Sequence, residues 1–489
     1  MTDRDGVYET RRNLRGWRER RDWRPPAGGP RPEAWHRLGA RIVKRLLPVV
    51  LVAATVAACT SAPSTSGSQA GAAEYKPGDP VEIGLPFPAN LVGLAALFGG
   101  ALGSSGAAPP TDAQTKAFYQ AVVDHVNSNG GLLGSKIKPV YYSLDATSVA
   151  GTSAEQKMCT QFTQDHHVFA VMALQNHSDT LVSCLQAAGS LMLDPAGPAA
   201  VDDTFFTQHP RYAAAGALSL TKVAAVQVNG LWQAGFFSPG AKVGLVGYNS
   251  APFLRAIDQV LKPALASHGL TVADQQLIAP VSGVKDAGPA QQAISNAVLR
   301  FKAKGIDHVL FFDSLGGTLS PWTRAAAAQK YHPRLGFTTN ENPASRAFKG
   351  NKTNPDQVNQ FAKALAVGWF PKSDVLNPPV NATGVLCNKI MGEAGASAAQ
   401  AQFFWGVCDQ LLTLAAGVKA GGKLTATAAL AGLSKASSVP SAELLGPPSY
   451  AGGRRDGVAT ARILSFSLGC ECFQYTGANQ LPASLFEKG

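Results

Sequence analysis

The 489-residue sequence lacks the motifs of the common catalytic and phosphate-binding sites. It has no G-x-S-x-G nucleophile elbow, no H-E-x-x-H zinc motif and no G-x-G-x-x-G dinucleotide loop. Residues 417–424, GVKAGGKL, approach a P-loop, but Leu424 stands where the magnesium-binding Ser or Thr would be. We therefore interpret this segment as the C-cap of a helix, and we expect neither enzyme activity nor a cofactor.

An excess of positive charge is confined to the N-terminal part of the chain. Residues 1–58 hold 13 basic and 6 acidic residues, whereas residues 59–489 hold 30 and 26. Residues 59–489 are therefore close to electrical neutrality. A part of the chain with so little net charge has no broad basic surface, which argues against a nucleic-acid partner. The Arg-rich block at residues 1–45 has few aliphatic residues to bury, so we expect it to be disordered. Translation from Val43 would remove nearly all of this block.

The apolar segment at residues 46–58 is only thirteen residues long. That is short of the roughly 20 residues of a membrane-spanning helix and typical of a signal-peptide core. The segment ends in Val56-Ala57-Ala58-Cys59, which resembles a bacterial lipobox. This resemblance predicts that Cys59 is acylated and becomes the mature N-terminus; an ordinary signal peptide with an unmodified Cys59 is the alternative. Residues 59–80 are rich in Ser, Gly and Ala, which favours a flexible tether.

The six cysteines that remain after Cys59 are an even number, as expected of disulfides in an exported protein. Pairing between sequence neighbours is the simplest interpretation: Cys159 with Cys184, and Cys387 with Cys408. For Cys470 and Cys472 two interpretations remain, a strained local bridge or separate partners for the two thiols. The spacings of the six cysteines do not match a zinc site, and no cluster of His accompanies these cysteines, so we expect no metal.

From residue 81 onwards, β-rich and helical segments alternate. Predicted strands lie at residues 81–87, 136–145, 168–174, 190–196, 242–248, 271–280, 307–313 and 334–340. Predicted helices lie at residues 111–131, 154–166, 178–189, 219–235, 252–269, 290–305 and 320–331. Such alternation implies parallel sheets with right-handed crossovers. Two blocks of it predict an α/β fold with two doubly wound parallel-sheet lobes, whose ligand site lies beyond the carboxyl ends of the strands.

Several stretches resemble the type I periplasmic solute-binding proteins of the leucine/isoleucine/valine class, which serve ABC importers. The most specific match is residues 126–146, VNSNGGLLGSKIKPVYYSLDA, similar to that family's helix, double-glycine turn and second strand. Further matches are residues 81–93, 242–272, 304–317 and 403–433. The resemblance implies two lobes joined by a three-strand hinge. Lobe 1 is expected at residues 81–207 and 371–448, and lobe 2 at residues 208–370 and 449–489.

The resemblance also implies a function and a set of partners. A monomeric, lipid-anchored extracytoplasmic protein would capture a small solute, such as an amino acid, in a cleft between its lobes. Its partners would be that solute, the permease of an ABC importer and, through the anchor, the cell membrane. Two alternatives remain open: a ligand-sensing ectodomain lipoprotein, and a structural or adhesion lipoprotein with a degenerate cleft.

Ligand-binding residues carry over from the family in part. In lobe 1 the loops that hold a substrate carboxylate match residues 175–178 and 194–198, and the candidate ligand residues in them are Gln175, Asn176, His177, Ser178, Ala196 and Gly197. His177 stands where the family has a small hydroxyl residue; capping of the following helix is its alternative role. Asn90 lies in the loop after the opening strand.

In lobe 2, Glu341 matches the acidic residue that pairs with the α-ammonium group. A solvated turn residue is the alternative interpretation of Glu341. Ser314 stands where the family has an aromatic residue, and Tyr248 or Phe253 would then supply the aromatic wall. Packing of the cleft wall is the alternative role of Tyr248.

Overall fold

The computed structural model describes residues 75–76, 78–93, 108–146, 152–174, 178–195, 200–280, 284–346, 355–477 and 480–486. All of them belong to one compact unit, Thr65–Gly489. None of the helices in these ranges combines the length and the apolar character that a bilayer crossing requires. The predicted basic leader, the signal-peptide core and Cys59 lie outside the described residues.

The first sheet is parallel throughout, with strand order β2-β1-β3-β4-β5. Its strands are β1 (Val81–Ala89), β2 (Ile137–Asp145), β3 (Ala170–Met172), β4 (Leu191–Asp194) and β5 (Tyr212–Ala214). Alternate residues of β1, such as Ile83 and Leu85, are buried in a core with α2 (Asp112–Ser128) and α15 (Trp405–Gly421). Val171 and Met192 point to the opposite core, on the side of α3 (Thr152–Thr160) and α4 (Asp179–Ala187). Helices therefore cover both faces, as a doubly wound sheet requires.

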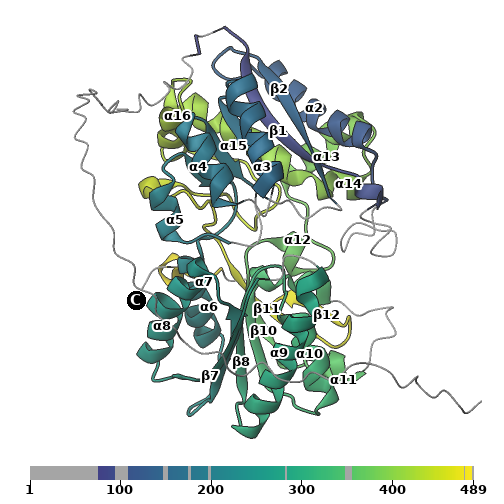
Figure 1. The fold of residues 1–489 in the computed structure, drawn as a ribbon, viewed down its shortest axis with the longest axis vertical. Coiled ribbons are helices and arrows are strands. Elements are labelled where there is room, and N and C mark those ends of the chain that lie inside the picture. The colour runs from purple at the N-terminus through teal and green to yellow at the C-terminus, as the bar shows by residue number, and fades with distance from the viewer. Residues whose placement is uncertain are drawn as a thin grey trace, which may run out of the picture. The chain divides into compact units, whose positions relative to one another are not determined.

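Helices from distant parts of the chain build lobe 1 together (Figure 1). The remaining ones are α5 (Asp203–Gln208), α13 (Ala382–Glu393), α14 (Ala398–Phe403) and α16 (Ala426–Leu433). The helix α2 starts with a capping box, in which Thr111 Oγ1 accepts from Gln114 N over 3.3 Å. The helix α15 has Gly422 as its C-cap, and the φ of 68° at this residue suits glycine. The interpretation of residues 417–424 as a helix C-cap is thereby confirmed.

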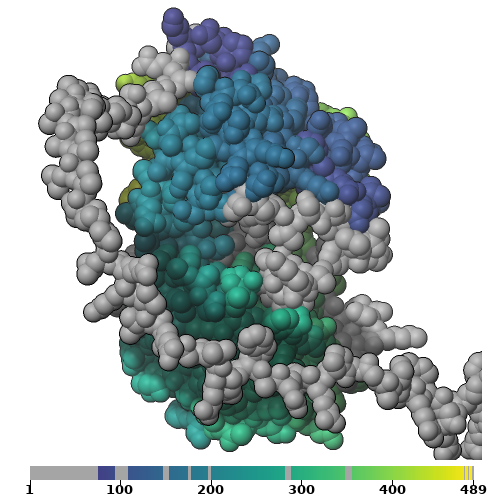
Figure 2. Space-filling model, viewed as in Figure 1, coloured from purple at the N-terminus to yellow at the C-terminus, as the bar shows by residue number. Residues whose placement is uncertain are grey.

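The second sheet has strand order β12-β11-β10-β9-β8-β6-β7. Its parallel strands are β6 (Val243–Tyr248), β7 (Val272–Ile278), β8 (His308–Phe312), β9 (Arg334–Thr338) and β10 (Leu365–Gly368). An antiparallel hairpin of β11 (Arg462–Ser467) and β12 (Cys472–Tyr475) extends the edge at β10. The helices of this lobe are α6 (Leu220–Gln233), α7 (Ala251–Ala256), α8 (Lys262–Ser267), α9 (Val284–Ala303), α10 (Leu319–Ala328) and α11 (Pro355–Asn359). On the face shown in Figure 2, green and teal residues of this lobe and blue residues of lobe 1 form most of the coloured surface.

Three connections join the two sheets. They run from β5 to α6, from β10 through α12 (Pro371–Asp374) to α13, and from α16 to β11. The strand β5 pairs with β4, so the first sheet continues to Ala214, a few residues past the boundary predicted at residues 207–208. The first and third connections meet where Ala214 bridges to Asp456.

Disulfides link the helices of lobe 1 as predicted. Cys159–Cys184 joins α3 to α4, and Cys387–Cys408 joins α13 to α15. Cys470 and Cys472 are bonded to each other in the turn between β11 and β12. Of the two interpretations of that pair, the direct local bridge is therefore the one that the structure shows.

Candidate functional site

Asn90 lies directly after β1, at the carboxyl edge of the first sheet. Its backbone is left-handed, with φ of 57°. The Asn90 N–H donates to Asp112 Oδ1 over 2.8 Å, and its side-chain amide reaches Asp145 Oδ1 at 3.4 Å. Asn90 is exposed, so a polar side chain stands at this strand end as the sequence predicts.

Ser178 precedes α4 and faces a carboxylate of the same lobe. Its N–H donates to Glu155 Oε1 over 2.7 Å, and its hydroxyl donates to Glu155 Oε2. Glu155 belongs to α3 and is 3% exposed. The sequence does not predict this role of Glu155, because nothing in its helix distinguishes it from a surface residue. The other predicted residues of these lobe 1 loops, Gln175, Asn176, His177, Ala196 and Gly197, lie outside the described residues.

A buried glutamine holds the ends of β3 and β4 in place. Gln410 of α15 donates from Nε2 to the carbonyl of Ala173 over 2.9 Å and to that of Leu193 over 2.7 Å. The disulfide at Cys408 fixes the same helix to α13. The ends of β3 and β4, from which the lobe 1 loops start, are therefore hydrogen-bonded to a helix that is itself cross-linked.

In lobe 2 the structure brings three predicted residues together. Tyr248 ends β6, and its hydroxyl donates to the carbonyl of Ser314 over 3.2 Å. The ring of Phe253 packs edge-on against Tyr248, with 5.3 Å between centroids. A Cβ on Gly317 would lie 2.2 Å from the Tyr248 oxygen, so only glycine leaves room for this contact. Tyr248 thus packs on the loop after β8, and the ring of Phe253 packs against the ring of Tyr248.

Glu341 is fully buried, in the short 3-10 turn Thr339–Glu341 that follows β9. Its carboxylate accepts from Asp313 N at 2.9 Å, from Thr338 N at 2.7 Å and from Thr338 Oγ1 at 3.0 Å. These bonds clamp the end of β8 to the end of β9. Burial, reinforced by the neighbouring Asp313 carboxyl, raises the pKa of Glu341 well above its ordinary value. Pairing of Glu341 with a ligand ammonium stays a prediction.

A second buried carboxylate organises the connection from β10 to α12. Asp374 accepts from Thr339 Oγ1 at 2.7 Å, from Phe370 N at 2.9 Å and from Tyr475 Oη at 2.6 Å. Burial raises the pKa of Asp374 to about 7, although these hydrogen bonds oppose the shift. The hinge segment, the end of β9 and the last strand are thereby held at one point.

The described residues contain no group of three or more His, Cys, Asp or Glu side chains placed to hold a metal ion. Their buried carboxylates instead accept hydrogen bonds from nearby loops. Such an arrangement shapes strand ends, and it places polar and aromatic groups at the carboxyl edges of both sheets.

Comparison with known proteins gives likeness in structure only. No family model matches the sequence, and no curated protein matches it. An ABC transporter substrate-binding protein from Desulfitobacterium hafniense in complex with Leu is 16% identical, with a TM-score of 0.53 over 81% of this chain and 100% of that chain. An R. palustris solute-binding protein with 4-hydroxybenzoate is 13% identical, with a TM-score of 0.56 over 82% and 97%. A fatty acid ABC transporter substrate-binding protein from Thermomonospora curvata is 13% identical, with a TM-score of 0.53 over 84% and 96%. The predicted type I periplasmic-binding-protein fold is thereby confirmed.

Proposed function

We propose that this chain is an extracytoplasmic solute-binding protein that captures a small solute between its two lobes and delivers it to an ABC importer. The observation that carries the proposal is the pair of predominantly parallel sheets joined by three connections, with polar and aromatic residues at the carboxyl ends of the parallel strands. In α/β sheets these ends are where ligands bind. Hinge closure around the solute would then create the state that the permease recognises, without any chemical reaction.

The solute class that we propose is a small molecule with a carboxylate and an apolar body, such as an amino acid. Leucine, 4-hydroxybenzoate and fatty acids, named for the similar structures, share that chemistry. In this chain Asn90 and the lobe 1 loops would meet the polar end. The Tyr248 and Phe253 pair would offer the aromatic wall.

A thermal-shift screen of the purified protein against amino acids, amides and small carboxylates tests solute capture. We expect at least one class to raise the melting temperature in proportion to its concentration. Glu341→Gln tests the amine role of Glu341, since loss of binding to an amine-bearing solute in a folded variant would support it. Absence of any stabilising solute, or chemical turnover of a bound one, would contradict the proposed function.

Lipid anchoring through Cys59 is a separate part of the proposal. The Val56-Ala57-Ala58-Cys59 sequence and the tether after it support acylation at this thiol. In Cys59→Ser the protein should move from the detergent phase to the aqueous phase of a Triton X-114 partition. Equal partition of the two proteins would show that another segment provides the anchor.

A further inference from the structure

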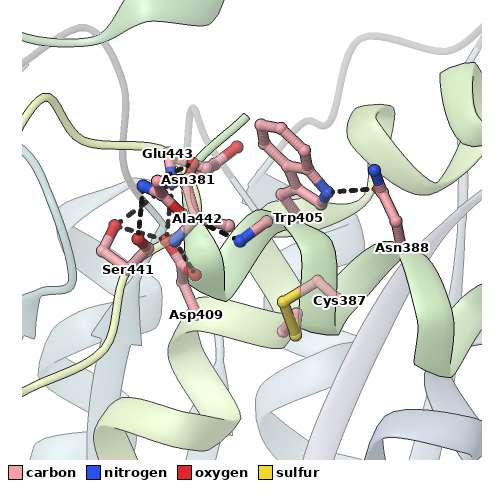
Figure 3. Close-up of a disulfide and its surroundings, with 10 residues drawn as sticks. Asn381, Cys387, Asn388, Trp405, Asp409, Ser441, Ala442 and Glu443 are labelled. Atoms are coloured by element: carbon pink, nitrogen blue, oxygen red, sulfur yellow. Dashed lines mark hydrogen bonds between the residues drawn. A yellow bond between two sulfur atoms is a disulfide. The ribbon is translucent and has the colours of Figure 1, made fainter. Parts of the chain in front are cut away.

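A buried acidic pair lies where the connection from α16 to β11 crosses α15. Asp409 of α15 accepts from Ser441 Oγ at 2.6 Å, from Ala442 N at 2.6 Å and from Glu443 N at 3.2 Å. Figure 3 shows these residues pointing toward one another beside the Cys387–Cys408 disulfide. Asp409 thus fixes the backbone of the connection on a rigid helix, and it thereby fixes the position of Glu443.

The side chain of Glu443 is not used in that arrangement. It is 3% exposed, and its Oε1 lies 3.5 Å from Lys372 Nζ of α12. Its Oε2 is buried and has no hydrogen-bond partner among the residues that the structure describes. A buried carboxylate oxygen without a donor lowers the stability of the folded protein, because it has lost its hydrogen bonds to water. Glu341 differs in this respect, because both of its oxygens accept hydrogen bonds from the protein.

The unpartnered oxygen lies at the carboxyl edge of the first sheet. A Cβ on Gly406, the second residue of α15, would be 3.6 Å from Glu443 Oε2 and 3.2 Å from the Cβ of Pro195. Pro195 directly follows β4. Glu443 therefore lies beside a strand end of the kind where α/β proteins bind ligands, and glycine at position 406 keeps the space next to it free of a side chain.

We propose that Glu443 receives the cationic group of the bound solute, an ammonium or an amidinium. This inference rests on the proposed function and sharpens it, because it selects amine-bearing solutes over simple carboxylic acids. A cation at Oε2 would supply the missing donors in a charge-assisted hydrogen bond. Lys372 occupies only the other oxygen and, being partly exposed, donates also to the Phe403 carbonyl over 2.9 Å.

Proton release should accompany binding of such a cation. The charged groups that face Glu443 are Lys372 and Asp409, and Tyr450 in turn faces Asp409. Burial raises the pKa of Glu443; Lys372 opposes this shift and Asp409 adds to it. A cationic ligand favours the ionised carboxylate, so the proton held by the acidic pair is expelled when the ligand binds.

Calorimetry with solute pairs that differ only in the amine tests this role. The probes are L-leucine with 4-methylpentanoate and L-phenylalanine with 3-phenylpropanoate, in two buffers of different ionisation enthalpy. We expect the wild-type protein to bind one amine-bearing member at least about tenfold more tightly than its partner, with proton release. Glu443→Gln should abolish both the preference and the proton release. Glu393→Gln, at an exposed glutamate of α13, should retain both.

The results that would overturn the inference are distinguishable from one another. Equal binding of both members of a pair, or a preference that survives in Glu443→Gln, would leave solute capture standing and exclude Glu443 as the cation site. A preference lost in Glu341→Gln but kept in Glu443→Gln would assign the amine to Glu341. Absence of binding by every probe in the wild-type protein would count against the proposed function and the inference together. Melting temperatures of the variants show whether each remains folded.

Discussion

The hydroxyl of Tyr475 donates to Asp374 Oδ2 over 2.6 Å and so ties the last strand to the hinge segment before α13. Asp374 is fully buried, and it also accepts hydrogen bonds from Thr339 Oγ1 and Phe370 N. The pair therefore couples the C-terminal hairpin to the second connection between the lobes.

Tyr475→Phe should lower the free energy of unfolding by about 1.5–3 kcal/mol, the range for hydrogen bonds to charged groups. Urea unfolding measures this change. Tyr142→Phe is the matched control, because the Tyr142 hydroxyl donates to the neutral carbonyl of Ala154 over 3.1 Å; its loss should cost about 0.5–1.5 kcal/mol. An equal or larger cost in the control would contradict a special role for the Asp374 contact.

Stability should rise as the pH falls from 8 to about 5.5. Burial raises the pKa of Asp374 to about 7, and it also raises the pKa values of Asp313 and Asp409. In this window the folded state binds more protons than the unfolded state, whose carboxyls titrate near pH 4, so protonation favours folding. His268 opposes the trend, since burial lowers its pKa. Melting temperatures across this range measure the slope, and Asp374→Asn should flatten it. A protein that is most stable at pH 8 would refute this prediction.

The alternation of strands and helices predicts both parallel sheets, because each crossover helix has to bury its apolar stripe on a neighbouring strand. The final hairpin follows no such local rule. β11 and β12 join the edge of the sheet at β10, where Ile463 pairs with Val367 of a strand much earlier in the sequence. The local pattern around Ile463 does not indicate this partner. Likewise β5 has only three residues, and its place in the first sheet comes from its pairing with β4.

The residues of the candidate site also fall into two groups, those that the strand positions predict and those that only the folded structure reveals. The ends of β6 and β8 follow from strand positions, so Tyr248 and Ser314 meet as the pattern predicts. The partners of the buried carboxylates arise from the folded arrangement instead. Glu155 reaches Ser178 from another helix, and Asp409 of α15 accepts from the backbone N–H of the buried Glu443. No spacing rule in a single sequence reveals such pairs.

An ion pair between α5 and α7 contributes to stability and joins the two lobes. Arg255 donates from Nε to Asp202 Oδ2 over 2.6 Å and from a terminal nitrogen to Oδ1 over 3.1 Å. Asp202 is 2% exposed, so removal of the guanidinium leaves a buried carboxylate poorly compensated. Arg255→Met should therefore lower the free energy of unfolding by about 1–3 kcal/mol in urea titrations. Arg255→Lys should cost less, since an ammonium keeps the charge but not the two-point contact. A lysine variant as unstable as the methionine variant would argue against an electrostatic cause.

Gly317→Ala should disturb the lobe 2 part of the site. The added Cβ would lie 2.2 Å from the Tyr248 hydroxyl oxygen, and the ring cannot retreat freely because Phe253 packs on it and Phe312 packs on Phe253. We expect a loss of about 1–3 kcal/mol in stability from this overpacking. If Tyr248 lines the solute site, affinity for the solute found by the thermal-shift screen falls as well. Gly392→Ala in α13 is the control, since a Cβ there meets nothing within 4 Å; it should be neutral or stabilising by up to about 1 kcal/mol. Unfolding curves together with calorimetric titrations separate the two effects, and unchanged affinity in a measurably destabilised Gly317→Ala would remove Tyr248 from the binding surface.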